Sequence, residues 1–295
     1  MVYNIQGYFE VESVNEATAL LAAAPHLLVI AGGTDVLIKM HHGQIEKAEL
    51  LSIRKIKSLQ GVVKLEDGTI LIGSLTTFTQ IANDPVIKEN IPVLAEAALT
   101  MGGPQIRNVA TIGGNICNGA TSADSASTLF ALDARLKLQS NQGERVVPIQ
   151  EFYLGPGKVD LKPGELLTQI IISPENYRGY GGHYIKFSMR KAMDIATLGV
   201  AVICKVKQGN ILEDVRIGLG VAGPTPLRCP EAEAFARGKT ISPETIAEIG
   251  KLAVKATQAR TSWRASKEYR EHLVEELTQR ALKAAIVKAG GEAIA

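Results

Sequence analysis

Two short segments with paired glycines could hold a negatively charged ligand. AGGTD at residues 31–35 follows an apolar stretch, and TIGGN at residues 111–115 repeats the same design further along the chain. Paired glycines have no Cβ, so successive backbone N–H groups can converge on an anion such as a pyrophosphate without help from a lysine. Both segments are therefore candidates for binding a phosphorylated ligand.

Side chains beside the two pairs could complete such a site. Thr34 and Asn115 could donate hydrogen bonds, whereas Asp35 and Asp124 could accept them from ribose or ring groups. A polar run at residues 118–125 follows the second pair. Either pair alone could equally form a tight turn at the end of a strand. Finding both pairs together with the polar run favours ligand binding.

Two better-known glycine motifs fail on inspection. GLGVAG at residues 218–223 matches the dinucleotide-binding pattern, but Pro224 and Pro226 follow it at once. Prolines there cannot open the helix whose N-terminus would bind the pyrophosphate. GKT at residues 238–240 resembles the end of a P-loop, but Glu233 stands where the leading glycine should be.

Histidine and cysteine predict no metal or thiol chemistry in this chain. The five histidines form no HExxH motif, and the pair at residues 41–42 is typical of a solvated loop. Three cysteines cannot make a disulfide framework, and none is spaced as CxxC. Cys117 lacks a nearby downstream cation that would lower its pKa, which favours packing over reactivity.

The composition excludes several classes of protein. Lys and Arg number 32 against 30 Asp and Glu, a net charge of +2 that gives no reason to expect nucleic acid or a membrane as partner. A hydrophobic fraction of 46% argues against disorder, and 295 residues predict about two domains. No apolar stretch reaches the roughly 18 residues of a membrane span, and the first residues do not resemble a secretory signal.

Local patterns predict helices and strands in an α+β arrangement. Ser13 and Glu16 form a capping-box pattern before a helix, and Asp67-Gly68 marks a hairpin within residues 62–73. A polar, turn-rich stretch at residues 173–182 predicts a linker between two domains. The other predicted strands are residues 26–30, 49–53, 135–138, 145–149, 166–172, 184–189, 197–205 and 215–221, and the predicted helices are residues 17–24, 77–83, 90–99, 231–237, 243–258 and 266–288.

The two glycine pairs belong to a longer resemblance. AGGTD followed by GPQIRNVATIGGNICNGATSADS at residues 103–125 resembles the FAD-binding subunit of the molybdenum hydroxylases, the xanthine dehydrogenase family. EFYLGPGKV at 151–159, GELLTQIII at 164–172, KFSMRKAMDIAT at 186–197, GVAGPTPLRC at 220–229 and SWRASKEYR at 262–270 extend it over nearly the whole chain. The similarity is strongest to the separate flavoprotein subunit of bacterial xanthine dehydrogenases.

The resemblance implies an α+β fold of the vanillyl-alcohol-oxidase (PCMH) type. An FAD-binding domain at residues 1–176, with subdomains at about 1–55 and 56–176, would be followed by a C-terminal α+β flavoprotein domain at residues 183–290. The resemblance also implies roles for particular residues, with Asp124 near the ribityl and ribose region, Leu167 beside the adenine and Lys186 at the flavin. The expected FAD-binding residues are Val29, Ile30, Ala31, Gly32, Gly33, Thr34, Asp35, Val36, Thr111, Ile112, Gly113, Gly114, Asn115, Asn118, Asp124, Leu167, Lys186 and Ile195.

The same resemblance implies an electron-transfer function. A large subunit with a molybdenum cofactor would oxidise the substrate, and a small subunit with two [2Fe–2S] clusters would pass electrons to FAD, which would reduce NAD by hydride transfer. Some relatives have a Tyr beside the isoalloxazine where this chain has Ile195, which favours access for NAD. No catalytic acid or base is expected from this chain, and a cytoplasmic dimer of heterotrimers is the expected assembly.

Several alternatives remain open at this stage. Xanthine or hypoxanthine is the favoured substrate of the complex, but nicotinate, an aldehyde or another heterocycle would fit, and ferredoxin or a quinone could replace NAD. The chain could also be a stand-alone flavin reductase of the same superfold, such as the peptidoglycan-precursor enolpyruvyl reductase. A binding or scaffold protein, in which the glycines only form turns, is the remaining class.

Overall fold

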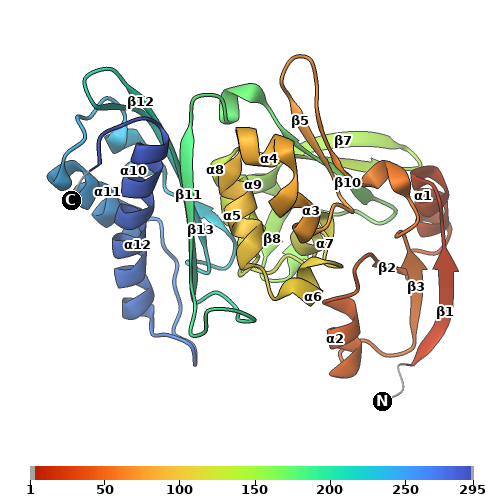
Figure 1. Cartoon of the computed structure of the whole chain (residues 1–295). Helices are drawn as coiled ribbons and strands as arrows, with labels where there is room; N and C mark the ends of the chain where they lie inside the picture. The colour runs from red at the N-terminus through yellow and green to blue at the C-terminus, as the bar shows by residue number, and fades with distance from the viewer. Residues whose placement is uncertain (1–3, 294–295) are drawn as a thin grey trace.

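The computed structural model describes residues 4–293, which form three main sheets in succession along the chain (Figure 1). The first sheet has the strand order β1 (Ile5–Glu10), β3 (Ala48–Ser52), β2 (Leu28–Ile30), and all its strands are parallel. Parallel neighbours need crossover connections. Here these connections contain the helices α1 (Val14–Ala23) and α2 (Val36–His41). The strands predicted at 26–30 and 49–53 are confirmed, whereas β1 was not predicted because exposed residues dominate it.

Helix α1 begins with half of the predicted capping box. The Ser13 side chain accepts a hydrogen bond from the Glu16 N–H at 3.2 Å. The Glu16 carboxylate accepts one from the N–H of Glu12 at 3.0 Å, rather than from Ser13. The predicted start of the helix is therefore nearly right, and the second bond is displaced by one residue.

The second sheet is antiparallel and contains five strands. Their order is β4 (Val62–Lys64), β5 (Ile70–Gly73), β10 (Leu166–Ile172), β6 (Arg135–Ser140), β7 (Gly143–Pro148). The hairpin predicted within residues 62–73 is confirmed, and the strands predicted at 135–138 and 145–149 pair as a second hairpin. In the first, Gly68 has φ +94°, and the Asp67 carboxylate accepts from the Thr69 N–H at 2.7 Å, so the turn residues act as their types predict. The small strands β8 (Tyr153–Gly155) and β9 (Lys158–Val159) pair separately.

The helices beside this sheet differ in part from the prediction. The helix predicted at 77–83 is confirmed as α3 (Phe78–Asn83), but the one predicted at 90–99 is wrong at its start, because Asn90 ends a separate helix. Helix α8 (Asp124–Ala131) was not predicted, because its small hydroxyl residues look polar although all eight of its residues are buried. The other helices here are α4 (Pro85–Asn90), α5 (Pro92–Thr100), α6 (Pro104–Arg107), α7 (Ile112–Cys117), α8 (Asp124–Ala131) and α9 (Ile149–Phe152), with a 3₁₀ turn at Lys57–Leu59.

The third sheet is antiparallel and lies between two layers of helices (Figure 1). Its strands are β11 (Gly181–Phe187), β12 (Leu198–Lys207), β13 (Ile211–Gly220) and β14 (Leu227–Arg228), in that order. Helices α5 and α8 pack on one face, and α12 packs on the other. The predicted helices near the C-terminus are confirmed as α10 (Pro230–Ala236), α11 (Pro243–Val254) and α12 (Lys267–Lys288), with α11 ending earlier than predicted.

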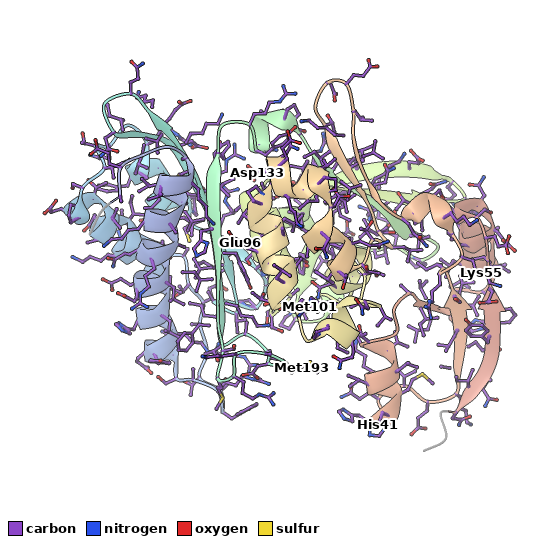
Figure 2. The ribbon with its side chains drawn as sticks, viewed as in Figure 1. His41, Lys55, Glu96, Met101, Asp133 and Met193 are labelled. Carbon is purple, nitrogen blue, oxygen red and sulfur yellow. The ribbon has the colours of Figure 1, made fainter. Side chains whose placement is uncertain are left out.

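Packed contacts join the third sheet to the second. Glu96 on α5 accepts hydrogen bonds from His183 at 2.9 Å and from Lys288 (Glu96 is labelled in Figure 2). Burial acts against its charge, yet these bonds hold the pKa of Glu96 down at about 2. The segment 173–182, predicted as a linker, includes a 3₁₀ turn and the buried Tyr177, whose hydroxyl donates to the carbonyl of Gly68 at 2.6 Å. This segment connects the second and third sheets along the chain, and it packs against the rest of the protein rather than forming a solvated linker.

The rejected GLGVAG motif has a structural role. Gly218 lies on β13 where a Cβ would be 1.9 Å from the carbonyl oxygen of Ser127 on α8. The glycine is thus needed for close helix packing, and the described residues 221–229 between β13 and α10 contain no helix. The architecture as a whole is α+β, as predicted. Among the helices described, none is long and apolar enough to cross a membrane.

Candidate functional site

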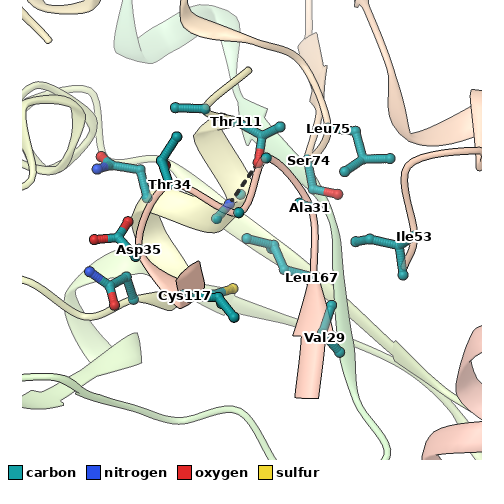
Figure 3. A pocket seen from close by; sticks show the side chains of 18 of the residues that line it. Val29, Ala31, Thr34, Asp35, Ile53, Ser74, Leu75, Thr111, Cys117 and Leu167 are labelled. Carbon is teal, nitrogen blue, oxygen red and sulfur yellow. Dashed lines mark hydrogen bonds between the residues drawn. The ribbon is translucent and has the colours of Figure 1, made fainter. Parts of the chain in front are cut away.

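A pocket opens between the first and second sheets, with both glycine pairs in its wall (Figure 3). The cavity itself has a volume of about 240 Å³, and it opens to solvent at its mouth. The predicted residues that line it are Val29, Ala31, Gly32, Gly33, Thr34, Asp35, Val36, Thr111, Gly113, Gly114, Asn115, Asn118 and Leu167.

Within each pair the two glycines have different surroundings. A Cβ on Gly32 would lie 2.0 Å from the carbonyl oxygen of Val109, and one on Gly113 would lie 2.6 Å from Ser74. Gly33 has φ +75°, which a side chain disfavours, whereas Gly114 is exposed and has only the Thr111 hydroxyl near its Cβ position, at 3.0 Å. The first glycine of each pair thus permits close backbone packing.

The first loop presents unused backbone donors to the pocket. None of the N–H groups of residues 32–36 donates a hydrogen bond within the part of the chain that the structure describes. These residues follow the end of β2 and run into the start of α2, where N–H groups have no intrahelical partner. Successive free N–H groups attract an anion. The first loop therefore has the property that its sequence predicts.

In the second segment, the backbone N–H groups of residues 112–115 already donate hydrogen bonds within the protein. Thr111 caps α7 by accepting from the Gly114 N–H at 3.2 Å, the dashed line in Figure 3. The expectation that the two pairs share one design is therefore not supported by the hydrogen bonds. The other bonds of this segment run from the N–H groups of Ile112 to Thr76 (3.0 Å), of Gly113 to Ser74 (2.8 Å) and of Asn115 to Thr111 (3.0 Å).

Comparison with known families accounts for both parts of the chain. Residues 3–175 match the family described as the FAD binding domain in molybdopterin dehydrogenase, and residues 183–285 match the CO dehydrogenase flavoprotein C-terminal domain. The chain belongs to the FAD-binding subunits of the molybdenum hydroxylases. These subunits are components of oxidoreductases, and their FAD-binding fold is the one that the sequence resemblance implied.

Individual relatives of this FAD-binding subunit match along nearly its full length. The xanthine dehydrogenase FAD-binding subunit of Escherichia coli O157:H7 is 42% identical over 99% of both chains. The carbon monoxide dehydrogenase medium chain of Hydrogenophaga pseudoflava is 32% identical over 94% of this chain and 96% of the relative. A solved structure of carbon monoxide dehydrogenase from that organism superimposes with a TM-score of 0.92 at 30% identity, covering 98% of this chain and 99% of the other.

Two groups in the pocket wall fit a large phosphorylated cofactor. The Ser74 hydroxyl is buried without a hydrogen-bond partner in the described residues, although Ser74 lines the pocket. A buried polar atom without a partner is costly, which is consistent with a ligand group completing it. Lys39 lies on α2 and adds a positive charge to the lining. The pocket of this FAD-binding subunit therefore combines free N–H groups, a hydroxyl and a cation.

Sequence reasoning missed Lys39, since it assumed a phosphate site without lysine. The Lys39 ammonium donates to the side-chain oxygen of Asn118 at 2.7 Å, which joins α2 to the segment after the second glycine pair. Asp35 lies one helical turn before it at the exposed mouth, where partial burial raises the pKa of the carboxyl and Lys39 opposes that rise. The spacing of four residues between Asp35 and Lys39 could have indicated this pair.

Cys117 lines the pocket as a neutral thiol. It is half-buried, and burial raises its pKa to about 12. A thiol with so high a pKa is a poor nucleophile at neutral pH, since the thiolate is the reactive form. This agrees with the predicted packing role.

The remaining predicted residues do not line the pocket. Asp124 and Lys186 are 6% and 8% exposed and form an ion pair at 2.8 Å, and the Tyr184 hydroxyl donates to Asp124 at 2.9 Å. Burial raises the pKa of Asp124, against the effect of Lys186. Ile195 is 50% exposed on the loop between β11 and β12. The other two residues outside the lining are Ile30 and Ile112.

Proposed function

We propose that this chain binds one FAD without a covalent link and is the electron-transfer subunit of a xanthine dehydrogenase-like molybdenum hydroxylase. The observation that supports it best is the run of free N–H groups at residues 32–36 beside Lys39, in the wall of the pocket that both glycine segments line. These donors suit the pyrophosphate. The neutral Cys117 thiol favours a non-covalent cofactor.

The chain's own residues bind and orient the cofactor in this proposal. Residues 32–36 and Lys39 would hold the phosphates, and the Ser74 hydroxyl would bond a polar group deeper in the pocket. Val29 and Leu167 supply apolar wall on two different sheets. Bound FAD supplies redox chemistry that converts single-electron transfer into two-electron transfer. No proton-transferring side chain of this chain is required.

The partners and the acceptor extend the same proposal. We place the molybdenum cofactor in a large partner subunit and two [2Fe–2S] clusters in a small one, assembled as a cytoplasmic dimer of heterotrimers. NAD is the proposed acceptor, supported by Ile195 and its 50% exposed side chain, which leaves room where a tyrosine would not. A purine such as xanthine or hypoxanthine is the proposed substrate, supported by 42% identity to a xanthine dehydrogenase subunit against 32% to the nicotinate dehydrogenase FAD-subunit of Eubacterium barkeri.

The first experiment is a cofactor assay on the purified chain. We expect flavin absorption bands, one FAD per chain and full release of the FAD into the supernatant when the protein is precipitated with acid. A chain without flavin, or with flavin that stays attached to the precipitate, would contradict the binding proposal. A chain that is fully active alone with NADPH would instead support the stand-alone reductase.

The second experiment tests the acceptor in the purified complex. Replacing Ile195 by Tyr is expected to abolish the reduction of NAD by purine while the reduction of an artificial dye continues. Ile195→Val is the matched control and should retain both activities. Loss of both activities in Ile195→Tyr would contradict a specific role in NAD access.

A further inference from the structure

Three arginines converge at the start of α12 without a counter-ion. Arg270 is only 3% exposed, and its guanidinium donates to the carbonyl of Thr197 and, at 2.8 Å, to the Ser262 hydroxyl. Burial and the charges of Arg260 and Arg264 lower the pKa of Arg270. Within residues 4–293 no carboxylate forms an ion pair with any of the three. A buried cation without a counter-charge is costly, so this positive charge needs a different explanation.

Two guanidinium nitrogen atoms at the start of α12 also have unused hydrogen-bonding capacity. The Nε atoms of Arg264 and Arg270 are buried and have no hydrogen-bond partner in the described chain. The Arg264 guanidinium lies over the ring of Trp263, 4.1 Å from its centroid, and that tryptophan is 76% exposed. An exposed tryptophan beside arginines is the combination that is enriched at protein interfaces.

The loop between β11 and β12, residues 188–197, continues this surface. This loop and the loop that precedes α12, residues 255–266, lie at the same end of the third sheet in Figure 1. Arg270 joins the two loops, because its guanidinium donates to Thr197 in one and to Ser262 in the other. Tyr269 on α12 packs edge-on against Phe187 at the root of the loop, with the ring centroids 6.2 Å apart. Large apolar side chains protrude from the loop, namely Met189, Met193 and Ile195, which are 69%, 53% and 50% exposed.

The charge on this second loop is also positive. Arg190 and Lys191 are exposed, and the one acidic residue between them and Thr197, Asp194, is paired with Arg190 at 3.5 Å. The surface therefore carries exposed apolar side chains among cations that outnumber its acidic residues, Asp194 and Glu268, on two loops that one buried arginine holds together. Its chemistry complements a protein surface that carries carboxylates.

This surface adjoins the cofactor pocket. The Met193 N–H donates to the carbonyl of Gly102 at 3.3 Å, and the neighbouring Met101 lines the pocket. Figure 2 shows Met193 on its loop below Met101. A protein seated on the loop would thus lie next to the pocket, and electron transfer requires such proximity.

We propose that residues 189–193 together with residues 260–269 dock an acidic protein surface of the electron-donating partner subunit. The partner's carboxylates would neutralise the arginines, and Trp263 and the two methionines would be buried at the centre of the contact. This proposal rests on the proposed function, because it assigns the docking surface of that electron-transfer complex.

The test uses the complex purified through a tag on this chain, produced together with its partner subunits. The variants are the double substitution Arg260→Glu with Trp263→Ala on one loop and Lys191→Glu on the other, all at exposed positions. Lys207→Glu is the matched control, since it makes the same charge change at the other end of β12. Iron, molybdenum and FAD, each per copy of this chain, the dissociation constant for the partner at low and high salt, and the thermal unfolding midpoint of the chain alone are measured.

We expect the double variant to weaken partner binding at least about tenfold. Lys191→Glu should weaken it less and reduce its salt dependence, while FAD content and the unfolding midpoint stay unchanged. Lys207→Glu should behave as wild type. The proposal is overturned if the double variant assembles with wild-type iron content and affinity, if the wild-type chain assembles with no iron-containing partner, or if the variants only change self-association of the isolated chain. Absence of FAD from the wild-type chain would contradict the proposed function instead, because assembly is measured independently through iron.

Discussion

The loop at residues 31–36 and the segment at residues 111–115 line the same pocket, yet within the described chain only the first has a run of successive free backbone N–H groups. The N–H groups of residues 32–36 are free within the described chain, whereas those of residues 112–115 bond to neighbouring carbonyls and to the Thr111 hydroxyl. The difference arises at the helix that begins beside each pair. In the second segment a side chain caps the helix, and in the first no side chain does so.

A glycine pair can therefore mark close packing as well as phosphate binding. Gly32 lets the first loop approach the backbone at Val109, immediately before the second segment, and Gly113 lets α7 approach Ser74. Gly114 is different because its side-chain direction is open to the pocket. The second segment can therefore offer close approach to a ligand at Gly114, while the first supplies hydrogen bonds.

The largest effect is expected for Gly32→Ala. The new Cβ would lie 2.0 Å from a backbone oxygen, which cannot move aside as a side chain could. We expect the free energy of unfolding to fall by about 3 kcal/mol and FAD binding to be lost with it. Chemical denaturation of the apoprotein and fluorescence titration with FAD measure the two quantities.

Gly114→Ala is the control from the second segment. Its Cβ would meet only the Thr111 hydroxyl at 3.0 Å, and alanine favours the helix in which it lies. We expect a change in stability below about 0.5 kcal/mol. Equal destabilisation by both substitutions would contradict the distinction between a packed and an open glycine.

The features that the sequence predicts correctly are those that local residues determine. The hairpin turn at Asp67-Gly68, the strand pair on either side of Gly143 and the cap at Ser13 were predictable in whole or in part because local chemistry determines them. The pocket residues on the two glycine segments could be named, since short motifs specify them. Helix α8 could not, because its burial depends on distant partners such as Gly218. The use of the N–H groups, and the contact between Lys39 and Asn118, likewise depend on tertiary packing alone.

The next effect concerns the cation beside the first loop. Lys39→Met keeps the apolar stem and removes the charge that we place near the phosphates. We expect FAD affinity to fall about tenfold, equivalent to about 1.4 kcal/mol, with weaker salt dependence and unchanged riboflavin affinity. Lys39→Arg should retain most of the affinity, and an equal loss for riboflavin would show that the charge does not act on phosphate.

A smaller effect is expected from the cap of the second segment. Thr111→Val preserves the shape of the side chain but removes the oxygen that accepts from the Gly114 N–H. We expect the apoprotein to lose about 1 kcal/mol of stability in thermal or chemical unfolding. Ser266→Ala, at the exposed N-cap of α12, gives a reference for a cap outside the pocket. If FAD restored the lost stability only in the Thr111 variant, the freed Gly114 N–H would be a ligand contact. Both segments would then donate backbone hydrogen bonds to the ligand, contrary to the difference described above.

The smallest effect is expected from the titration of Asp35, at the mouth beside the free N–H groups. Partial burial raises the pKa of this carboxyl above its usual range, Lys39 opposes that rise, and a bound anionic phosphate would raise the pKa further. FAD binding should therefore take up a fraction of a proton, so affinity falls as pH rises through the raised pKa and is level above it. The change in affinity should be only about threefold, because Asp35 is exposed and screened.

The raised pKa of the Asp35 carboxyl also affects the stability of the protein. The contribution of this group to the free energy of unfolding falls as pH rises through the same window, so Asp35→Asn should remove both trends. Glu46→Gln, an exposed change outside the pocket lining, should leave them intact. Titrations across acidic to neutral pH distinguish these outcomes, and a wild-type pH profile retained in Asp35→Asn would place the anion away from the first loop.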